Sequence, residues 1–384
     1  MRVTRSRIAG SPILSTVTDR MDETAFREWI SGRRRGVGPA VSRCSLRVLS
    51  WLYGLGVRGR NAAFDAGLKR IHHAAVPVVS VGNLTTGGTG KTPFVAFLVE
   101  WFRERGVKPA ILSRGYRAID GRENDEKLVL DRLCPGVPHL QHPERVRSAR
   151  RACTEFAAEV LVLDDGFQHR RLARDLDIVL IDALRPFGYG HLLPRGLLRE
   201  PLASLRRADL IVLTRVDQCE EREKRLIHEC IHALRPEVEI VEIAYPPTSL
   251  VNAAGETAGL ESLTGRRIGA FCGIGNPEAF RAALLKFGLN VADDGFRTFP
   301  DHHHYTPAEL DELASRFRRQ HLAAVLTTEK DLVKIERNDL AGVPLRAVRI
   351  GATIVSRGEE LNRALEGLPF RAVPSRREPA SGRE

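Results

Sequence analysis

A glycine-rich stretch ending in Gly-Lys-Thr is the part of this chain whose chemistry is easiest to infer. It follows the apolar run Val78-Val79-Ser80-Val81-Gly82 and precedes residues with helical spacing. Glycines let consecutive backbone N–H groups face phosphate oxygens, and a helix N-terminus adds positive potential. Lys91 would contact the β- and γ-phosphates of a nucleotide, and the Thr92 hydroxyl would ligate Mg²⁺. The predicted nucleotide-binding residues are Thr85, Thr86, Gly87, Gly88, Thr89, Gly90, Lys91 and Thr92.

One position departs from the strict phosphate-binding pattern, which has Gly six residues before the Lys. That position is Thr85 in this chain. Gly87 and Gly88 lie inside the loop and could supply the missing flexibility.

A nucleotide site of this kind also needs an acid at the end of a neighbouring strand. The apolar run Val160-Leu161-Val162-Leu163 ends in Asp164 and Asp165. Mg²⁺ prefers carboxylate and water oxygens, so we expect one of these carboxylates to hold the ion directly or through water.

A glycine-rich loop of this kind, called a P-loop, also occurs in GTPases. Thr214-Arg215-Val216-Asp217 follows a predicted strand and resembles the [Asn/Thr]-Lys-x-Asp signature with which GTPases read guanine. Arg stands where that signature has Lys. A GTP-driven switch or metallochaperone is therefore the alternative interpretation.

Polar and glycine clusters recur at predicted strand or loop ends, where ligand-binding groups concentrate. They read Leu-Ser-Arg-Gly-Tyr (112–116), Asp-Asp-Gly-Phe-Gln-His (164–169), Arg-Pro-Phe-Gly-Tyr-Gly (185–190), Leu-Pro-Arg-Gly-Leu-Leu-Arg-Glu-Pro (193–201) and Phe-Pro-Asp-His-His-His-Tyr (299–305). With the glycine-rich loop and a Thr-x-Lys-Asp near residue 330, their order resembles the tetraacyldisaccharide 4′-kinase family of lipid A biosynthesis from about residue 50 to about residue 350. That family's loop carries Thr at the position of Thr85, which removes the objection to ATP binding.

The resemblance implies ATP- and Mg²⁺-dependent phosphorylation of the 4′-hydroxyl of an acylated disaccharide 1-phosphate lipid. A sugar hydroxyl needs a proton acceptor within hydrogen-bond reach. In the family this is an Asp of a Gly-Asp-Glu-Pro segment, paired with a His of a Phe-x-Asp-His segment. Here the first segment reads Asn124-Asp125-Glu126-Lys127, so Asp125 is the expected base and His302 its partner, with Glu126 as the alternative base.

Several polar residues of the shared motifs are expected to contact substrate or nucleotide. They are Asn83, Arg114, Gln168, His169, Arg195, Arg199 and Glu200. Guanidinium groups bind phosphate bidentately, so the arginines are candidates for the lipid 1-phosphate or the ATP phosphates. Three adjacent histidines, 302–304, cannot all face one ion, and no Cys or His at zinc-like spacing completes a metal site.

Positioning these groups requires parallel strands whose carboxyl ends meet. Apolar runs alternate with amphipathic stretches, which predicts an α/β fold: a P-loop domain and a smaller C-terminal α/β domain. Strands are expected at 76–82, 109–113, 159–164, 177–182 and 209–214, then at 267–273, 322–327 and 345–350. Helices are expected at 92–105, 145–157, 198–207, 218–234, 277–287 and 306–320. The predicted divisions are a basic extension (1–43), the P-loop domain (44–244), a linker (245–265), the second domain (266–368) and a disordered tail (369–384).

The distribution of charge along the chain indicates which classes of binding partner to expect. The chain has 59 Lys and Arg against 48 Asp and Glu, a net charge of +11, of which residues 1–43 contribute +5 and residues 369–384 contribute +2. A nucleic-acid enzyme would more often carry a basic face on its folded body, so we expect no nucleic-acid partner, and no obligate protein partner is inferred. The first 20 residues lack periodicity, and Met21 is a plausible alternative start of translation.

Residues 41–57 combine many apolar side chains with flanking arginines. This pattern fits a helix lying on an anionic membrane, and equally a helix packed on the domain body. No uncharged apolar run reaches about 18 residues, and the basic N-terminus has no apolar signal core. We therefore expect a peripheral enzyme on the cytoplasmic face of the inner membrane.

Overall fold

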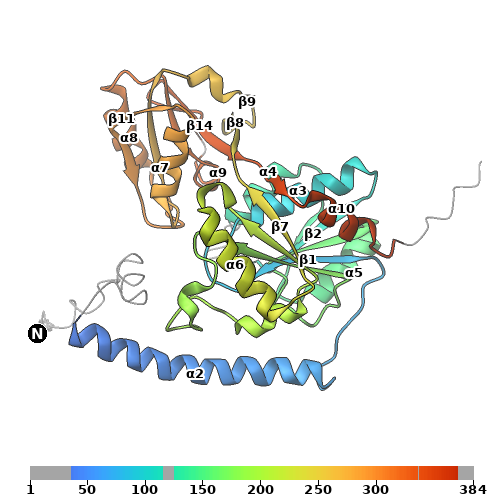
Figure 1. Ribbon diagram of the computed structural model, residues 1–384. Coiled ribbons are helices and arrows are strands. Elements are labelled where there is room, and N and C mark those ends of the chain that lie inside the picture. Colours follow the sequence, from blue (N-terminus) through green and yellow to red (C-terminus); the bar gives the residue numbers. More distant parts are fainter. Residues whose placement is uncertain (1–35, 116–124, 336, 371–384) are drawn as a thin grey trace, which may run out of the picture.

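Two lobes, each built around its own β-sheet, make up the computed structural model, which describes residues 36–115, 125–335 and 337–370 (Figure 1). The expected α/β class with a mostly parallel sheet is confirmed. The predictions for the first 35 residues, including the alternative start, and for residues 371–384 lie outside the described residues.

The first sheet has the strand order β15-β7-β6-β5-β1-β4-β2-β3, and only β15 runs antiparallel to its neighbour. Its strands are β1 (Val78–Asn83), β2 (Pro109–Ser113), β3 (His139–Gln141), β4 (Val160–Asp164), β5 (Leu176–Asp182), β6 (Leu210–Thr214), β7 (Glu239–Ala244) and β15 (Thr353–Ser356). Strands β1, β2, β4, β5 and β6 are buried along their whole length. Burial on both faces explains why they read as continuous apolar runs.

Helices cover both faces of this sheet. On one face α3 (Lys91–Glu104), α4 (Asp125–Leu133) and α10 (Gly358–Glu366) share a core with alternate strand residues. On the other face lie α5 (Arg145–Glu155), α6 (Glu221–Leu234) and the 3-10 turn η3 (Leu202–Arg207). Shorter 3-10 turns are η2 (Gly188–Gly190) and η4 (Val216–Gln218). The carboxyl ends of β1 and β4 lie side by side, because Val81 pairs with Asp164.

The second lobe has the strand order β11-β10-β12-β14-β8-β9, with β13 paired to β14. Its strands are β8 (Pro247–Val251), β9 (Thr257–Ala258), β10 (Arg267–Cys272), β11 (Asn290–Thr298), β12 (Ala324–Thr328), β13 (Asp339–Leu340) and β14 (Val343–Ile350). Its helical segments are η5 (Leu260–Leu263), α7 (Pro277–Lys286), α8 (Pro307–Arg318) and α9 (Glu329–Leu332). Helix α8 begins with a capping box in which Thr306 and Glu309 satisfy each other's free backbone N–H groups.

The division of the chain between the lobes differs from the sequence expectation. Strands β8 and β9 of the supposed 245–265 linker belong to the second sheet. Strand β15 and helix α10, expected in the second domain, return to the first lobe, where Leu361 and Leu365 enter the core. Strands β8, β9 and β15 are short and only partly buried, so they carry too few apolar residues to be recognised as strands.

A helix expected at 198–207 is also absent over its first turn. Leu198 instead forms bridges with Thr85 and Leu192, and the Arg199 N–H donates to the Leu84 carbonyl. Only η3 remains helical. Pro201 disfavours a helical backbone at Glu200 and cannot itself donate a hydrogen bond, so the helical turn starts after it.

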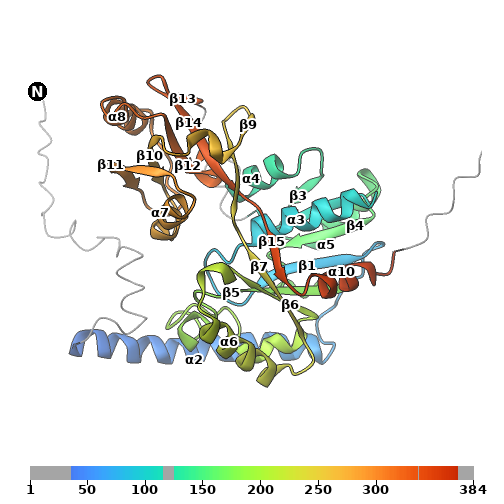
Figure 2. The same ribbon diagram turned by 45° about the horizontal axis from the view of Figure 1, so that its top comes forward.

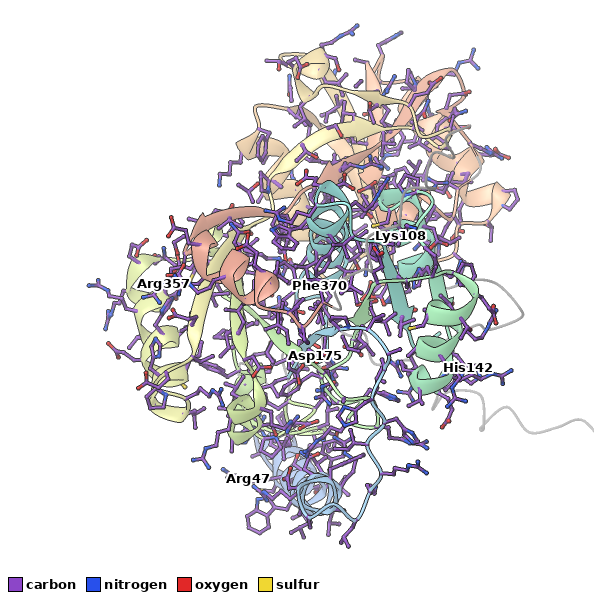
Figure 3. The ribbon with its side chains drawn as sticks, turned by 90° about the vertical axis from the view of Figure 1, so that its right-hand side faces the viewer. Arg47, Lys108, His142, Asp175, Arg357 and Phe370 are labelled. Atoms are coloured by element: carbon purple, nitrogen blue, oxygen red, sulfur yellow. The ribbon has the colours of Figure 1, made fainter. Side chains whose placement is uncertain are left out.

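A long helix, α2 (Val37–Asp65), runs along the side of the first lobe away from the second lobe in both ribbon views (Figures 1 and 2). Viewed from the side, α2 is seen nearly end-on, with Arg47 beside it (Figure 3). It exposes a set of large apolar side chains: Val41, Val48, Leu49, Trp51, Leu52 and Leu55 are each 50% or more exposed. Within the described residues, no helix is long and apolar enough to cross a membrane.

Candidate active site

The predicted phosphate-binding loop lies between the carboxyl end of β1 and the N-terminus of α3. Gly90 is the residue before the helix and has a left-handed backbone (φ +84°). The buried Tyr245 hydroxyl donates to the Gly90 carbonyl at 2.8 Å, and a Cβ on Gly90 would collide with the tyrosine ring. Only glycine satisfies both conditions, so this turn requires Gly. Lys91 and Thr92 then form the first turn of α3, where a phosphate would face free backbone N–H groups.

Asn83 organises the loop from behind. Its side chain is fully buried and donates to the Thr89 hydroxyl at 3.0 Å, while its amide oxygen accepts from Lys91 Nζ at 3.4 Å. The same oxygen also contacts the Arg199 guanidinium. We expected Asn83 to touch substrate or nucleotide, but these partners leave it enclosed, so its contribution is to hold Lys91 and the loop in place.

The two neighbouring carboxylates occupy different environments. Asp165 accepts two hydrogen bonds of 2.8 Å from Arg199 and lies 3.5 Å from Lys91 Nζ. Burial alone would raise the pKa of Asp165, but Lys91 and Arg199 lower it well below its usual range. Asp164 is buried, and burial together with the nearby Glu126 carboxylate raises its pKa. Asp165 is thus held ionised, while the charges of Lys91 and Arg145 only partly offset the raised pKa of Asp164.

Asp164 has the properties of a cation ligand. Its Oδ1 is buried without a hydrogen-bond partner among the described residues. A divalent cation at this oxygen would satisfy it and favour the ionised carboxylate. Thr92, Asp164 and Asp165 supply the hydroxyl and carboxylate oxygens that Mg²⁺ prefers, so the residues present fit this ion. In the described ranges no group of three or more His, Cys, Asp or Glu residues could hold a metal by itself.

Asp125 and His302 come together from the two lobes. Asp125 begins α4, and His302 lies in the loop after β11; His302 Nδ1 is 2.7 Å from Asp125 Oδ2. Burial raises the pKa of Asp125, but the His302 hydrogen bond and charge, with Lys330 and Lys334, lower it to about 2. The same hydrogen bond raises the pKa of His302. Both shifts favour an ion pair of an aspartate and an imidazolium.

Glu126, the alternative base, has a different partner. Its carboxylate lies 3.5 Å from Lys330 Nζ. Because Glu126 also raises the pKa of Asp164, the start of α4 lies near the carboxylates of the nucleotide site. Of the two acids, Asp125 alone has the hydrogen bond to His302 among the contacts described.

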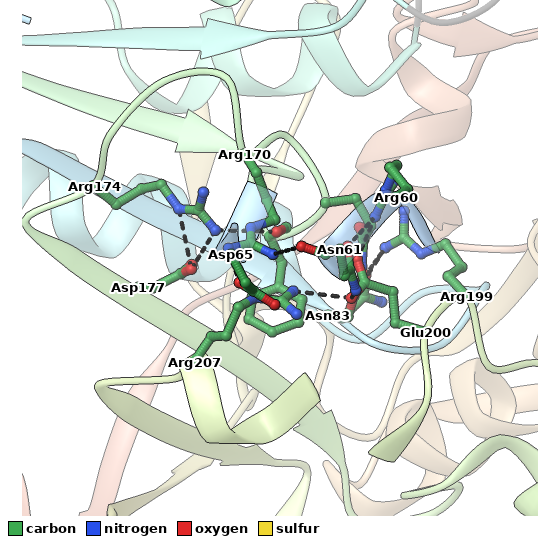
Figure 4. Close-up of polar contacts among 12 residues, drawn as sticks. Arg60, Asn61, Asp65, Asn83, Arg170, Arg174, Asp177, Arg199, Glu200 and Arg207 are labelled. Carbon is green, nitrogen blue, oxygen red and sulfur yellow. Dashed lines mark hydrogen bonds and ion pairs between the residues drawn. The ribbon is translucent and has the colours of Figure 1, made fainter. Parts of the chain in front are cut away.

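Two of the expected substrate contacts have other partners (Figure 4). Glu200 is fully buried, and its carboxylate accepts from Arg60 and Asn61 of α2 and from Arg207 of η3. Protein donors therefore occupy both oxygens, which corrects the expectation that Glu200 binds substrate. Arg199 is committed to Asp165 and Asn83.

The remaining expected contacts do not gather at one point. The backbone N–H of Arg195 donates to Ser50, which places Arg195 against α2. Arg114 lies near Arg145 and His169, and its charge lowers the pKa of both side chains. Gln168 donates to the Asn83 carbonyl at 2.9 Å.

Two histidines of the 302–304 run contact acids of different lobes. His303 Nε2 lies 3.1 Å from Glu309, and His302 pairs with Asp125. His302 also has a left-handed backbone (φ +59°). This conformation is strained for residues other than glycine, and such strain is often found at functional sites.

Sequence reasoning missed three residues around the site. Arg145 of α5 is 4% exposed, its Nε has no described partner, and its pKa is lowered first by burial. Tyr245 supports the loop, and Lys334 Nζ lies 4.0 Å from Asp125. In the sequence, Arg145 is an arginine at the start of a predicted helix and Lys334 follows Lys330 by four residues. Neither pattern indicates a functional site by itself.

Comparison with known proteins gives one consistent result. The family model described as tetraacyldisaccharide-1-P 4′-kinase (LpxK) matches residues 42–368. A tetraacyldisaccharide 4′-kinase from Anaeromyxobacter sp. (strain Fw109-5) is 42% identical over 349 residues, covering 86% of this chain and 92% of that protein. One from Halothermothrix orenii is 35% identical over 326 residues, covering 77% and 83%. A crystal structure of LpxK from Aquifex aeolicus in complex with ATP has a TM-score of 0.66 and 31% identity, covering 84% of this chain and 98% of that one.

Proposed function

The chain belongs to the tetraacyldisaccharide 4′-kinase family, and on this premise we propose how its own residues act. The enzyme is a kinase that transfers the γ-phosphoryl group of ATP to the 4′-hydroxyl of a tetraacyldisaccharide 1-phosphate in lipid A biosynthesis. The observation that carries the proposed mechanism is the 2.7 Å contact between Asp125 and His302, at the start of a helix whose Glu126 lies near Asp164 at the end of β4.

Asp125 is the proton acceptor for the sugar hydroxyl. As the 4′-oxygen bonds to the γ-phosphorus, the bond from that phosphorus to the β–γ bridging oxygen breaks, ADP leaves, and the hydroxyl proton passes to the Asp125 carboxylate. A pKa of about 2 makes Asp125 a weak base that is ionised at neutral pH. A weak base suffices because phosphoryl transfer has a loose transition state in which the hydroxyl becomes acidic late. His302 orients Asp125 as a positioning residue.

Charge on the transferring group is neutralised by Lys91, which Asn83 and Asp165 hold at the loop. Thr92, Asp164 and Asp165 would hold Mg²⁺, which supplies further positive charge at the phosphates. Arg199 keeps Asp165 ionised and in a fixed orientation.

The mechanism is tested with purified protein, Mg-ATP and the disaccharide 1-phosphate in detergent micelles, with detection of the 4′-phosphorylated product. Asp125→Asn removes the proton acceptor and should lower kcat by about 10²- to 10⁴-fold while the Kd for ATP stays within about twofold. Asp131→Asn on the same helix is the matched control and should keep turnover. Unchanged turnover of Asp125→Asn would refute Asp125 as the base.

The guanine-nucleotide alternative receives less support. In the Thr-Arg-x-Asp segment, Arg215 pairs with Asp182 and Asp217 pairs with Lys286 of the second lobe. Both signature side chains are therefore engaged by protein. Tight binding of GTP together with no binding of ATP would overturn the kinase assignment.

Helix α2 is proposed to hold the enzyme on an anionic membrane, at the cytoplasmic face of the inner membrane. The sequence left membrane binding and core packing equally open. The exposure of Trp51 (70%), Leu52 (62%) and Leu55 (63%), together with Arg43 and Arg47 on the same helix, supports the membrane. Apolar side chains enter the interface while arginines attract anionic lipid.

Co-sedimentation with phosphatidylglycerol vesicles tests this role of α2. A Trp51→Asp/Leu52→Asp double variant should bind at least about tenfold more weakly, because two apolar side chains leave the interface and two negative charges are added. Leu226→Asp/Leu285→Asp replaces exposed leucines on α6 and α7 and is the matched control. Undiminished binding of the α2 variant would contradict the proposal.

A further inference from the structure

One motif of the sequence has no part in the proposed mechanism: the Thr-x-Lys-Asp segment, which is Thr328-Glu329-Lys330-Asp331. It forms the start of α9, on the side of the second lobe that faces the first lobe (Figure 1). Helix α9 packs against α4, the helix that begins with Asp125. The proposed mechanism does not use Asp331, although this residue is fully buried.

The carboxylate of Asp331 is more deeply buried than a helix cap requires. Its Oδ2 accepts from the Thr328 hydroxyl at 2.7 Å, and that hydroxyl accepts from the Asp331 backbone N–H at 3.2 Å, which caps α9. The corresponding acid of α8, Glu309, caps its helix with 34% of its side chain exposed. Burying a carboxylate costs free energy unless hydrogen bonds and charges compensate it, so the burial of Asp331 indicates further contacts.

One further contact of Asp331 leads to His302. Asp331 Oδ2 also accepts from the backbone N–H of Gly273 at 3.0 Å, and the Gly273 carbonyl accepts from the backbone N–H of His302 at 3.1 Å. A Cβ on Gly273 would lie 3.0 to 3.1 Å from the Pro300 carbonyl oxygen, Asp331 Oδ1 and the His303 Cβ, so these groups close tightly around the glycine. Because His302 has a strained left-handed backbone, its loop persists only where the surrounding structure holds it.

The other contact of Asp331 leads to Asp125 itself. Asp331 Oδ1 lies 3.2 Å from Lys334 Nζ, and this ammonium group lies 4.0 Å from Asp125 Oδ2. The Lys334 side chain is only 7% exposed, so solvent ions screen its charge little. His302 Nδ1 contacts the same oxygen of Asp125 at 2.7 Å. Asp331 is therefore linked to both of these side chains of the second lobe that reach Asp125 Oδ2.

We propose that Asp331 is a positioning residue that sets the Asp125–His302 pair from the second lobe. This inference rests on the proposed function. Asp331 fixes the His302 loop through Gly273, and it keeps the Lys334 ammonium group from displacing His302 at Asp125. The two cations compete because an ammonium and an imidazolium both bind a carboxylate strongly. Asp125 is thereby oriented by an imidazole that is itself held in place.

The kinetic test separates positioning from stability. Asp331→Ala removes both links and should lower kcat by about 10- to 100-fold, with KM for the disaccharide and Kd for ATP within about twofold of wild type. Leu284→Ala, which truncates a buried leucine of α7 in the same lobe, is the matched control. It opens a cavity and should lower the urea midpoint, as Asp331→Ala does, while kcat keeps its wild-type value.

The titration of His302 reports its position without turnover. In wild type the Asp125 hydrogen bond raises the pKa of His302 against the effect of burial, and Asp301 and Lys330 are the other charged groups that act on it. Imidazole ¹H–¹⁵N spectra measure this pKa, with the His302 signal identified by its loss in His302→Gln. The pKa should fall by about 1 unit in Asp331→Ala, because the imidazole moves away from Asp125. Leu284→Ala should titrate as wild type does.

Gly273→Ala tests the same link without removing a charge. Its Cβ presses on the Pro300 carbonyl and the Asp331 carboxylate, so His302 should shift, and both kcat and the His302 pKa should fall. This variant decides the question if Asp331→Ala does not fold.

An unchanged His302 pKa in folded Asp331→Ala or Gly273→Ala would overturn the inference. So would an unchanged kcat in the same variants, or losses of equal size in Leu284→Ala. Failure of the proposed function is a separate result: if Asp125→Asn keeps its turnover, Asp125 is not the base, and the His302 titration still decides whether Asp331 positions the pair.

Discussion

Glu200 provides a quantitative test of the structure, because sequence reasoning placed it at the substrate and the structure places it in a buried ionic network. Its carboxylate is fully buried and accepts from Arg60, Asn61 and Arg207. Removing one partner from a buried ion pair costs about 3–5 kcal/mol. Arg60 and Arg207 keep 35% and 21% of their side chains in solvent, so the lower end applies: Glu200→Gln should lower the free energy of unfolding by about 3 kcal/mol.

Urea unfolding measures this loss, with a lower midpoint and an unchanged m-value. Burial raises the pKa of Glu200, but Arg207 and Asn61 lower it below its ordinary value. A carboxyl with a lowered native pKa stabilises the fold above its unfolded-state pKa, and this stability is lost as the pH falls through the native pKa. The difference between wild type and Glu200→Gln should therefore be full near pH 7 and shrink in acid.

Glu155→Gln is the matched control for Glu200, because it breaks a fully exposed pair with Arg151 that solvent screens, so the urea midpoint should hardly change. The reasoning fails if Glu200→Gln keeps the full free energy of unfolding but raises KM for the disaccharide. The carboxylate would then bind substrate.

Two further perturbations address the site. His302→Gln removes the hydrogen bond that helps lower the pKa of Asp125 to about 2, so burial should raise that pKa and move the acid limb of the kcat/KM profile to higher pH. Lys330→Met should move the acid limb less. Superimposable profiles of wild type and His302→Gln between pH 4 and 9 would contradict this reasoning. Gly90→Ala forces a Cβ into the Tyr245 ring at a left-handed backbone, so ATP affinity should fall at least about tenfold, as measured by calorimetry. Gly87→Ala, left-handed but with open space around it, is the control, and equal losses would show that backbone strain alone is responsible.

The elements that the sequence predicted correctly are those whose residue pattern follows from their own burial. The central strands are buried on both faces, so β1, β4, β5 and β6 read directly as apolar runs. The edge strand β15 and the short β9 have mixed polarity, and they were missed. The helix expected at 198–207 failed because backbone groups of 198 and 199 bond to the P-loop segment, a long-range competition that local periodicity does not record.

The chemistry of the P-loop was determined by the sequence alone, because Gly90, Lys91 and Thr92 act through one local turn whose backbone geometry follows from residue type. Family resemblance, rather than spacing, indicated Asp125 and His302. Only the tertiary structure decided that they meet across 177 positions of chain, and that Arg60, Asn61 and Arg207 enclose the Glu200 carboxylate. The physical reason is that burial and electrostatic fields come from every element packed around a group, most of which are distant in sequence.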